Sequence, residues 1–253
     1  MRKLVFTMLC LAVPSIAGAY EMRLAWSNCL GAGGATTATF ACNTNSNMQA
    51  HTLVASFYPP EGIVSYVGNE VTLDVSFLDA VTPDWWAMKG TGQCRNGAAI
   101  SDASFAGGPF GCVDPWASQA VGGIANYNIA FTAPNRVRIQ LAFAVPASSA
   151  QPLDANQEYY ACKLTLLNTK TVGTGSCTGC SSPAAFMVSD VVLNQIPSDG
   201  SAHLGGVGTQ NMFAGWQCPV SFGFCDGCGT TWQPSCATPT RSATWGAIKA
   251  IYH

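Results

Sequence analysis

The sequence predicts an all-β protein, an Ig-like or jelly-roll-type β-sandwich with disulfide-tied loops and a short C-terminal helical tail. Apolar and polar residues alternate along many short segments, which is the period of a half-buried strand. Turn-forming Pro, Gly and Asn residues separate these segments, and helical periodicity is nearly absent. Twelve cysteines and a charged fraction of only 9% accompany this pattern. We therefore expect many short strands packed as sheets around one core.

The first nineteen residues are predicted to be a signal peptide that lies outside the fold. Arg2 and Lys3 supply its positive start, and the apolar run 4–13 is too short to span a bilayer. The small residues at 17–19 form the expected cleavage site. The mature chain should then begin at Tyr20 and be secreted or held at the cell surface. No later apolar segment is long enough to be a membrane helix.

Residues 20–197 are predicted to form the sandwich domain, which contains several segments with strand periodicity. In order along the chain these segments are 21–26, 53–58, 71–77, 125–131, 136–145, 158–166 and 187–193. The clearest is 71–77, in which four apolar residues alternate with Thr, Asp and Ser. Prolines and glycines lie between the segments, so each strand is expected to end in a turn.

The stretch 158–196 is central to this prediction, because it contains two strands joined by a Gly-, Ser- and Thr-rich bend. Cys162 and Leu164 lie on the apolar face of the first strand, with polar residues opposite. In the second strand Met187 and Val191 are expected to share a face. A period of two in both arms predicts a half-buried hairpin.

Residues 198–253 are predicted to form a separate Cys- and Gly-rich C-terminal extension. The segment 203–217 is expected to hold one last strand. The tail places Trp245, Ile248 and Ile251 three residues apart, which predicts a short amphipathic helix. A helix of this length is marginal alone. We therefore expect it to dock on another surface, either a partner or the export machinery.

Disulfides are the expected state of the cysteines, because an exported chain folds in an oxidising compartment. An odd number remains after removal of the signal peptide, which contains Cys10. Proximity in the sequence predicts the pairs Cys29–Cys42, Cys94–Cys112 and Cys177–Cys180, and two pairs among Cys218, Cys225, Cys228 and Cys236. Cys162 is left over in the middle of a strand, where a free thiol packs as a small hydrophobe.

Two Cys-x-x-Cys sequences, 177–180 and 225–228, leave two further interpretations open. Four thiolates among the last four cysteines would suit structural zinc, and one Cys-x-x-Cys would suit thiol exchange. Neither sequence lies at a strand-to-helix turn, and thiolates would have to escape oxidation during export. We therefore expect structural disulfides, with no metal and no cofactor.

Trp85, Trp86 and Trp116 are the candidate ligand-binding residues. The first two follow a strand and precede a cysteine-tied loop, and Trp116 lies in the same region. Aromatic rings at a loop tip stack on sugar rings, so a polysaccharide is the candidate ligand. The alternative is that the rings fill one end of the core and are covered by the loop. Adjacent strand residues face opposite ways, which favours one ring inside and one outside.

Catalytic patterns are lacking in the sequence. Its histidines are His51, His203 and His253, and neither H-E-x-x-H nor G-x-S-x-G occurs. The carboxylates are scattered, and no pair of the kind used in glycoside hydrolysis stands out. A basic patch is also missing, which argues against nucleic acid as a partner. We expect a protein that is not an enzyme.

Three segments together resemble those of uncharacterised exported bacterial proteins. They are PDWWAMKGTGQCR at 83–95, CVDPWASQAVGGIANYNI at 112–129 and PTRSATWGAIKAIYH at 239–253. The tail pattern Thr-Trp-Gly-x-Ile-Lys-x-Ile-Tyr is the most specific of them. More loosely, the layout is similar to cohesin-like and carbohydrate-binding sandwiches. The resemblance implies a secreted domain without an assigned activity. Export, the missing catalytic pattern and the low charge predict a structural, adhesive or binding protein of the cell surface or secretome, with a carbohydrate-binding module as the alternative.

Overall fold

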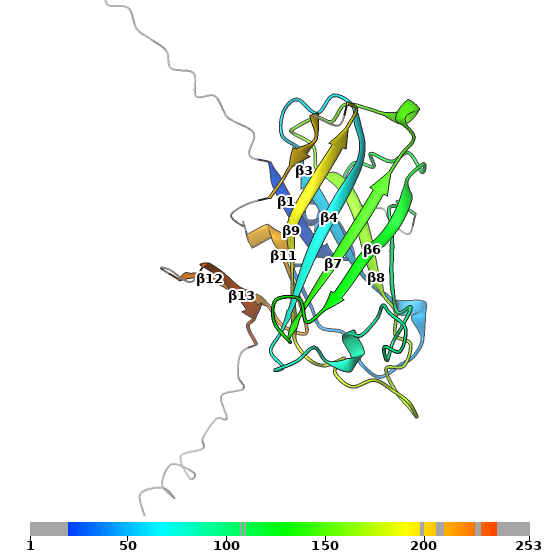
Figure 1. Cartoon of the computed structure of the whole chain (residues 1–253), viewed down its shortest axis with the longest axis vertical. Coiled ribbons are helices and arrows are strands. Elements are labelled where there is room, and N and C mark those ends of the chain that lie inside the picture. The colour runs from blue at the N-terminus through cyan, green and yellow to red at the C-terminus, as the bar shows by residue number, and fades with distance from the viewer. Residues whose placement is uncertain are drawn as a thin grey trace, which may run out of the picture.

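The structure, a computed structural model, describes residues 20–106, 108, 110–197, 200–205, 210–225 and 229–236. The described chain is mostly β-sheet, as predicted, and its strands belong to three sheets. Figure 1 shows the largest sheet in front and the second sheet behind it. The predicted signal peptide at 1–19 and the predicted helical tail lie outside the described residues.

The smaller of the two main sheets has four antiparallel strands in the order β1-β3-β8-β5. Their bounds are Glu21–Trp26 for β1, His51–Tyr58 for β3, Tyr159–Leu166 for β8 and Ala99–Asp102 for β5. Leu24, Leu53 and Leu164 project from β1, β3 and β8 into the core and are each 1% exposed. The alternation of apolar residues therefore correctly predicted three of these strands.

The larger sheet follows the order β2-β11-β9-β4-β7-β6, with β10 beside β9. The bounds are Thr37–Ala38 for β2, Tyr66–Phe77 for β4, Val121–Ile129 for β6, Arg136–Ala144 for β7, Ala184–Gln195 for β9, Ala202–His203 for β10 and Phe213–Trp216 for β11. Across β4 and β7, Leu73 pairs with Ile139 and Val71 with Leu141. These aliphatic side chains are buried, so the sheet turns one continuous apolar face to the core.

The remaining regular elements are short. The 3-10 helices are η1 (Leu30–Ala32), η2 (Asn47–Gln49), η3 (Asp84–Trp86), η4 (Ala147–Ser149) and η6 (Gln210–Met212). A third sheet is the antiparallel hairpin of β12 (Val220–Cys225) and β13 (Gly229–Pro234). Among the residues described, no helix has the length and apolar character needed to cross a bilayer.

Both main sheets contribute to one hydrophobic core. Trp26 of β1 meets Phe186 of β9 edge to face with ring centroids 5.6 Å apart, and Phe57 of β3 lies 6.3 Å from Tyr66 of β4. Aromatic pairs in these arrangements stabilise a core beyond the effect of area burial alone. The two sheets are therefore held together by large aromatic side chains.

The predicted hairpin of 158–196 is wrong, because β8 lies in the smaller sheet and β9 in the larger one. A β-bulge in β9 also changes the predicted pattern of that strand. β4 residue Thr72 pairs with Asp190 while the next residue, Leu73, pairs with Val188, so one residue of β9 is skipped. The extra residue reverses the alternation. Val188 is fully buried, whereas Met187 does not share the buried face of Val191 as predicted.

The predicted domain boundary at residue 197 is also wrong. β11 pairs with β9 on one side and with β2 on the other. Its Trp216 is fully buried, and the backbone carbonyl of Gly215 accepts a 2.9 Å hydrogen bond from the indole of Trp26. The strand expected within 203–217 thus exists, but it is part of the main fold and not of a separate extension.

Replacing Trp216 by Ala should lower the free energy of unfolding by about 3–5 kcal/mol, the usual cost of removing a buried Trp ring. Urea unfolding with the disulfides intact measures this loss. The matched control is Val64→Ala, because Val64 is 71% exposed. A loss below about 1 kcal/mol for Trp216→Ala would contradict the placement of β11 in the core.

Candidate functional site

The three tryptophans predicted to bind sugar are buried. Trp85, Trp86 and Trp116 are 0%, 2% and 1% exposed. Their indole nitrogens donate to Thr171 Oγ1 at 3.0 Å, to the Gly179 carbonyl at 3.3 Å and to the Ala161 carbonyl at 3.1 Å, respectively. The hypothesis that these rings form a stacking platform at a loop tip is therefore wrong. Their positions agree with the alternative interpretation, in which the rings fill one end of the core.

The prediction that one of the two adjacent rings faces outward is wrong for a geometric reason. Trp85 and Trp86 lie in the 3-10 helix η3, where there are about three residues per turn. Successive side chains there are separated by about a third of a turn instead of pointing to opposite faces. Both rings therefore reach the core, and they meet edge to face with centroids 5.0 Å apart.

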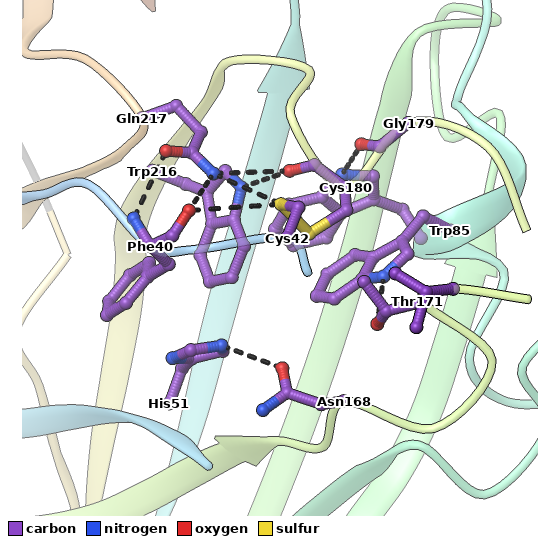
Figure 2. The surroundings of a disulfide bond; sticks show 12 residues. Phe40, Cys42, His51, Trp85, Asn168, Thr171, Gly179, Cys180, Trp216 and Gln217 are labelled. Atoms are coloured by element: carbon purple, nitrogen blue, oxygen red, sulfur yellow. Dashed lines mark hydrogen bonds between the residues drawn. A yellow bond between two sulfur atoms is a disulfide. The ribbon is translucent and has the colours of Figure 1, made fainter. Parts of the chain in front are cut away.

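An aromatic cluster surrounds the Cys42–Cys180 disulfide, and Figure 2 shows its members. Trp216 lies at its centre, with ring centroids 4.4 Å from Phe40 and 5.2 Å from Trp85. The Trp216 indole donates to the Cys180 carbonyl at 2.7 Å. The cluster is closed and well hydrogen-bonded, so we assign it a structural role.

His51 belongs to this cluster and is 8% exposed. Its Nε2 lies 2.9 Å from Asn168 Oδ1, and the Asn168 amide nitrogen donates to the Ser46 carbonyl. The amide oxygen therefore accepts from a neutral imidazole that is protonated at Nε2. Burial lowers the pKa of His51, the positive charge of Arg95 lowers it further, and the hydrogen bond with Asn168 opposes both effects.

Arg95 is a buried cation that sequence reasoning missed. It is 1% exposed, and its guanidinium carbon lies 3.5 Å from the centroid of the Trp85 ring. Its donors reach the backbone carbonyls of Trp85 and Thr169 at 2.8 Å and the carbonyl of Leu167. Burial lowers the pKa of Arg95 to about 10, so it remains protonated at neutral pH. The cation joins two loops through carbonyl dipoles and ring stacking.

The described residues contain four disulfides, and three of them join loops that are far apart in the sequence. The four are Cys29–Cys112, Cys42–Cys180, Cys94–Cys177 and Cys218–Cys236. The predicted pairs Cys29–Cys42, Cys94–Cys112 and Cys177–Cys180 are therefore wrong. Proximity in the sequence failed because three of the bridges span 83 or 138 residues. The two cysteines of the first Cys-x-x-Cys bond to different loops.

The other cysteines agree with the prediction as far as they are described. Cys218–Cys236 is one of the pairings allowed among the last four cysteines, while the side chains of Cys225 and Cys228 lie outside the described residues. Cys162 is buried and unpaired, as predicted, and burial raises the pKa of its thiol. Within the described residues, no three His, Cys, Asp or Glu side chains gather as a metal site would require.

The outer face of the larger sheet carries polar side chains on four neighbouring strands, β6, β7, β4 and β9. We call it the polar face, and its members are Thr72, Asp74, Asn126, Asn128, Arg138, Gln140 and Asp190. One row crosses four strands in the order Asn126, Gln140, Thr72, Asp190. In Figure 1 this side of β4, β7 and β6 faces the viewer.

Hydrogen bonds and ion pairs fix the side chains of the polar face. Asn126 donates to Gln140 Oε1 at 3.2 Å. Arg138 makes two hydrogen bonds, of 2.7 and 2.8 Å, to the carboxylate of Asp74, and this pairing raises the pKa of Arg138. Its guanidinium also stacks 3.9 Å from the centroid of Phe131. The face therefore presents two hydrogen-bonded amides, the Arg138–Asp74 pair and the carboxylate of Asp190, which lies 3.6 Å from His203.

Hollows adjoin the sheets in the described part of the chain. One has a volume of 480 Å³ and is lined by Thr36, Thr37, Asn211, Phe213, Pro219, Val220 and Ser221. Hollows of 360 and 280 Å³ lie near Phe143 and near Lys163. Sequence reasoning missed these hollows and the polar face. The available signal for the face was the set of polar residues that alternate with the core positions of each strand.

No protein-family model, curated protein or solved structure matches this chain. The resemblance to exported bacterial proteins stays a prediction.

Peptide mapping without reduction should recover Cys42 linked to Cys180 and Cys94 linked to Cys177, because these sulfur atoms meet in the fold. Mass spectrometry of the digested native protein identifies the linked peptides. Cleavage between Cys177 and Cys180 is needed to separate the two bridges. Recovery of a Cys177–Cys180 bond in the folded protein would contradict this disulfide map.

Stability should fall when the pH is lowered from 7 to 5, because the unfolded His51 takes up a proton more readily than the folded one. The stabilisation is complete above the unfolded pKa of about 6.5 and is lost as the pH falls toward the lowered folded pKa. One such proton gives a slope of at most about 1.4 kcal/mol per pH unit. Urea unfolding at several pH values measures it. His51→Gln should have a smaller slope, and an unchanged slope would refute this role.

Proposed function

We propose that this protein is an exported binding protein of the cell surface or secretome, with a structural or adhesive role and no catalytic activity. The supporting observation is a disulfide-linked core that carries a hydrogen-bonding sheet surface, the polar face. Four disulfides and a continuous core support an extracellular setting. The antiparallel sheets around one core also support the Ig-like or jelly-roll type of sandwich.

The side chains of the polar face favour a neutral or mixed-charge partner. Arg138 is already paired with Asp74, so binding need not separate an exposed charge from water. Asn126 and Gln140 are exposed amides, which offer both donors and acceptors. A surface of this kind recognises hydroxyl and amide groups through directional hydrogen bonds.

A polysaccharide is the second candidate ligand, as an alternative to a surface protein. Its support is the row of Gln140, Thr72 and Asp190 on neighbouring strands. Hydroxyl groups of a sugar chain that crosses the strands could meet these side chains in succession. This interpretation no longer uses Trp85, Trp86 or Trp116, because their rings are buried.

The mature protein should bind to an immobilised polysaccharide or surface protein, and the double variant Thr72→Ala, Gln140→Ala should bind about five- to 150-fold more weakly. Loss of two hydrogen-bonding side chains is worth about 1–3 kcal/mol, which gives this factor. Pull-down on panels of insoluble polysaccharides and immobilised surface proteins measures the binding. Asn156→Ala is the control, because Asn156 is an exposed amide on a loop outside the polar face.

The panel separates the two ligand classes and tests the proposal. Retention on polysaccharides alone would make the protein a sugar-binding module. Binding that is equal in the double variant and in Asn156→Ala would remove the polar face as the site. Turnover of any panel member would replace the proposal with an enzyme.

A further inference from the structure

Strand β6 is an edge strand of the larger sheet, and β5 lies close to it near Gly123. Its nine residues pair with β7, and no other strand of the described chain hydrogen bonds to it. Figure 1 shows β6 at the rim of the sheet. The N–H and C=O groups along the outer edge of such a strand are a ready template for another strand.

The other edge strands of the two main sheets have features that discourage pairing. β2 has only two residues, and β5 has four and ends at Asp102, which pairs with Lys163 at 3.3 Å. β1 carries Glu21 and Arg23. Short length and charge are the usual means by which edge strands avoid other chains.

β6 lacks both forms of protection. It is nine residues long, and no Asp, Glu, Lys or Arg occurs from Pro115 to Asn135. A bulge between Ile124 and Asn126 interrupts the strand and leaves 126–129 as a regular segment. Because bulges stop pairing locally, the bulge restricts an incoming strand to this segment.

We propose that β6 is a self-association edge, at which a second copy of this chain adds its own β6 in the antiparallel direction. A two-fold axis at Tyr127 places Asn126 opposite Asn128 of the second copy, and Asn128 opposite Asn126. Amides donate and accept, so each pair is complementary to itself. A symmetric pairing brings the same side chains of both copies close together, so charged residues would repel each other across the axis. An uncharged strand avoids this repulsion.

This inference does not depend on the proposed binding role. The pairing uses backbone groups at the rim. Asn126 and Asn128 belong to the polar face as well, but the ligand-binding test changes Thr72 and Gln140 and leaves β6 intact. The pairing would extend the polar face across two molecules. An extended peptide of a different protein is the competing occupant of the same edge.

Sedimentation equilibrium of the mature protein over a range of concentrations tests the proposal. The expected result is a reversible dimer. The double variant Asn126→Lys, Asn128→Lys should raise the dissociation constant at least about tenfold, because it places like charges opposite each other across the axis. The control Asn194→Lys adds an ammonium group on β9, away from the edge, and should leave the dissociation constant unchanged.

Hydrogen exchange at rising protein concentration supplies a second measurement on the unmodified chain. Amides within 126–129 should exchange more slowly as the dimer forms. A monomer at every concentration would overturn the proposal and leave the edge to other proteins. A dimer that persists in the Asn126→Lys, Asn128→Lys variant would also overturn the proposal. A dimer that forms without slower amide exchange within 126–129 would overturn it too.

Discussion

The aromatic packing around Trp216 is the interaction on which the rest of the structure depends. The Trp216 ring lies 5.7 Å from Trp26 of the smaller sheet and 5.3 Å from Trp86 of η3. Each of these rings is almost completely buried, and large aromatic side chains dominate the energetics of a core. A strand near the C-terminal end of the described chain thus joins both sheets and the loop before β5.

Disulfides and one buried cation close the loops over this packing. Cys42–Cys180 lies against Trp216, and Cys94 bonds to Cys177 beside Arg95. Arg95 stacks on the Trp85 ring and donates hydrogen bonds to the backbone carbonyls of Trp85 and Thr169. Cross-links between distant loops restrict the unfolded chain most strongly in the loop-entropy account of disulfides. The loops are therefore fixed without a large number of ion pairs.

The low fraction of charged residues determines the chemistry of the outer surface, as the aromatic rings determine the packing of the core. Only 9% of the residues are charged, and the strongest pair of the polar face, Arg138 with Asp74, neutralises itself. Amides and hydroxyls consequently form much of the outer surface of the sheet. The same shortage of charge leaves β6 without the usual protection of an edge strand. A binding face and a self-association edge are both consequences of this composition.

The sequence by itself located the longer strands of the two main sheets, because alternation is a local property of neighbouring residues. Segments 71–77 and 136–145 coincide closely with parts of β4 and with β7. Only the tertiary structure decided which cysteines meet, that both Trp85 and Trp86 are buried, and that β11 joins the main sheet. Those outcomes depend on contacts between residues far apart in the chain, and on a 3-10 turn and a bulge that shift side chains away from simple alternation.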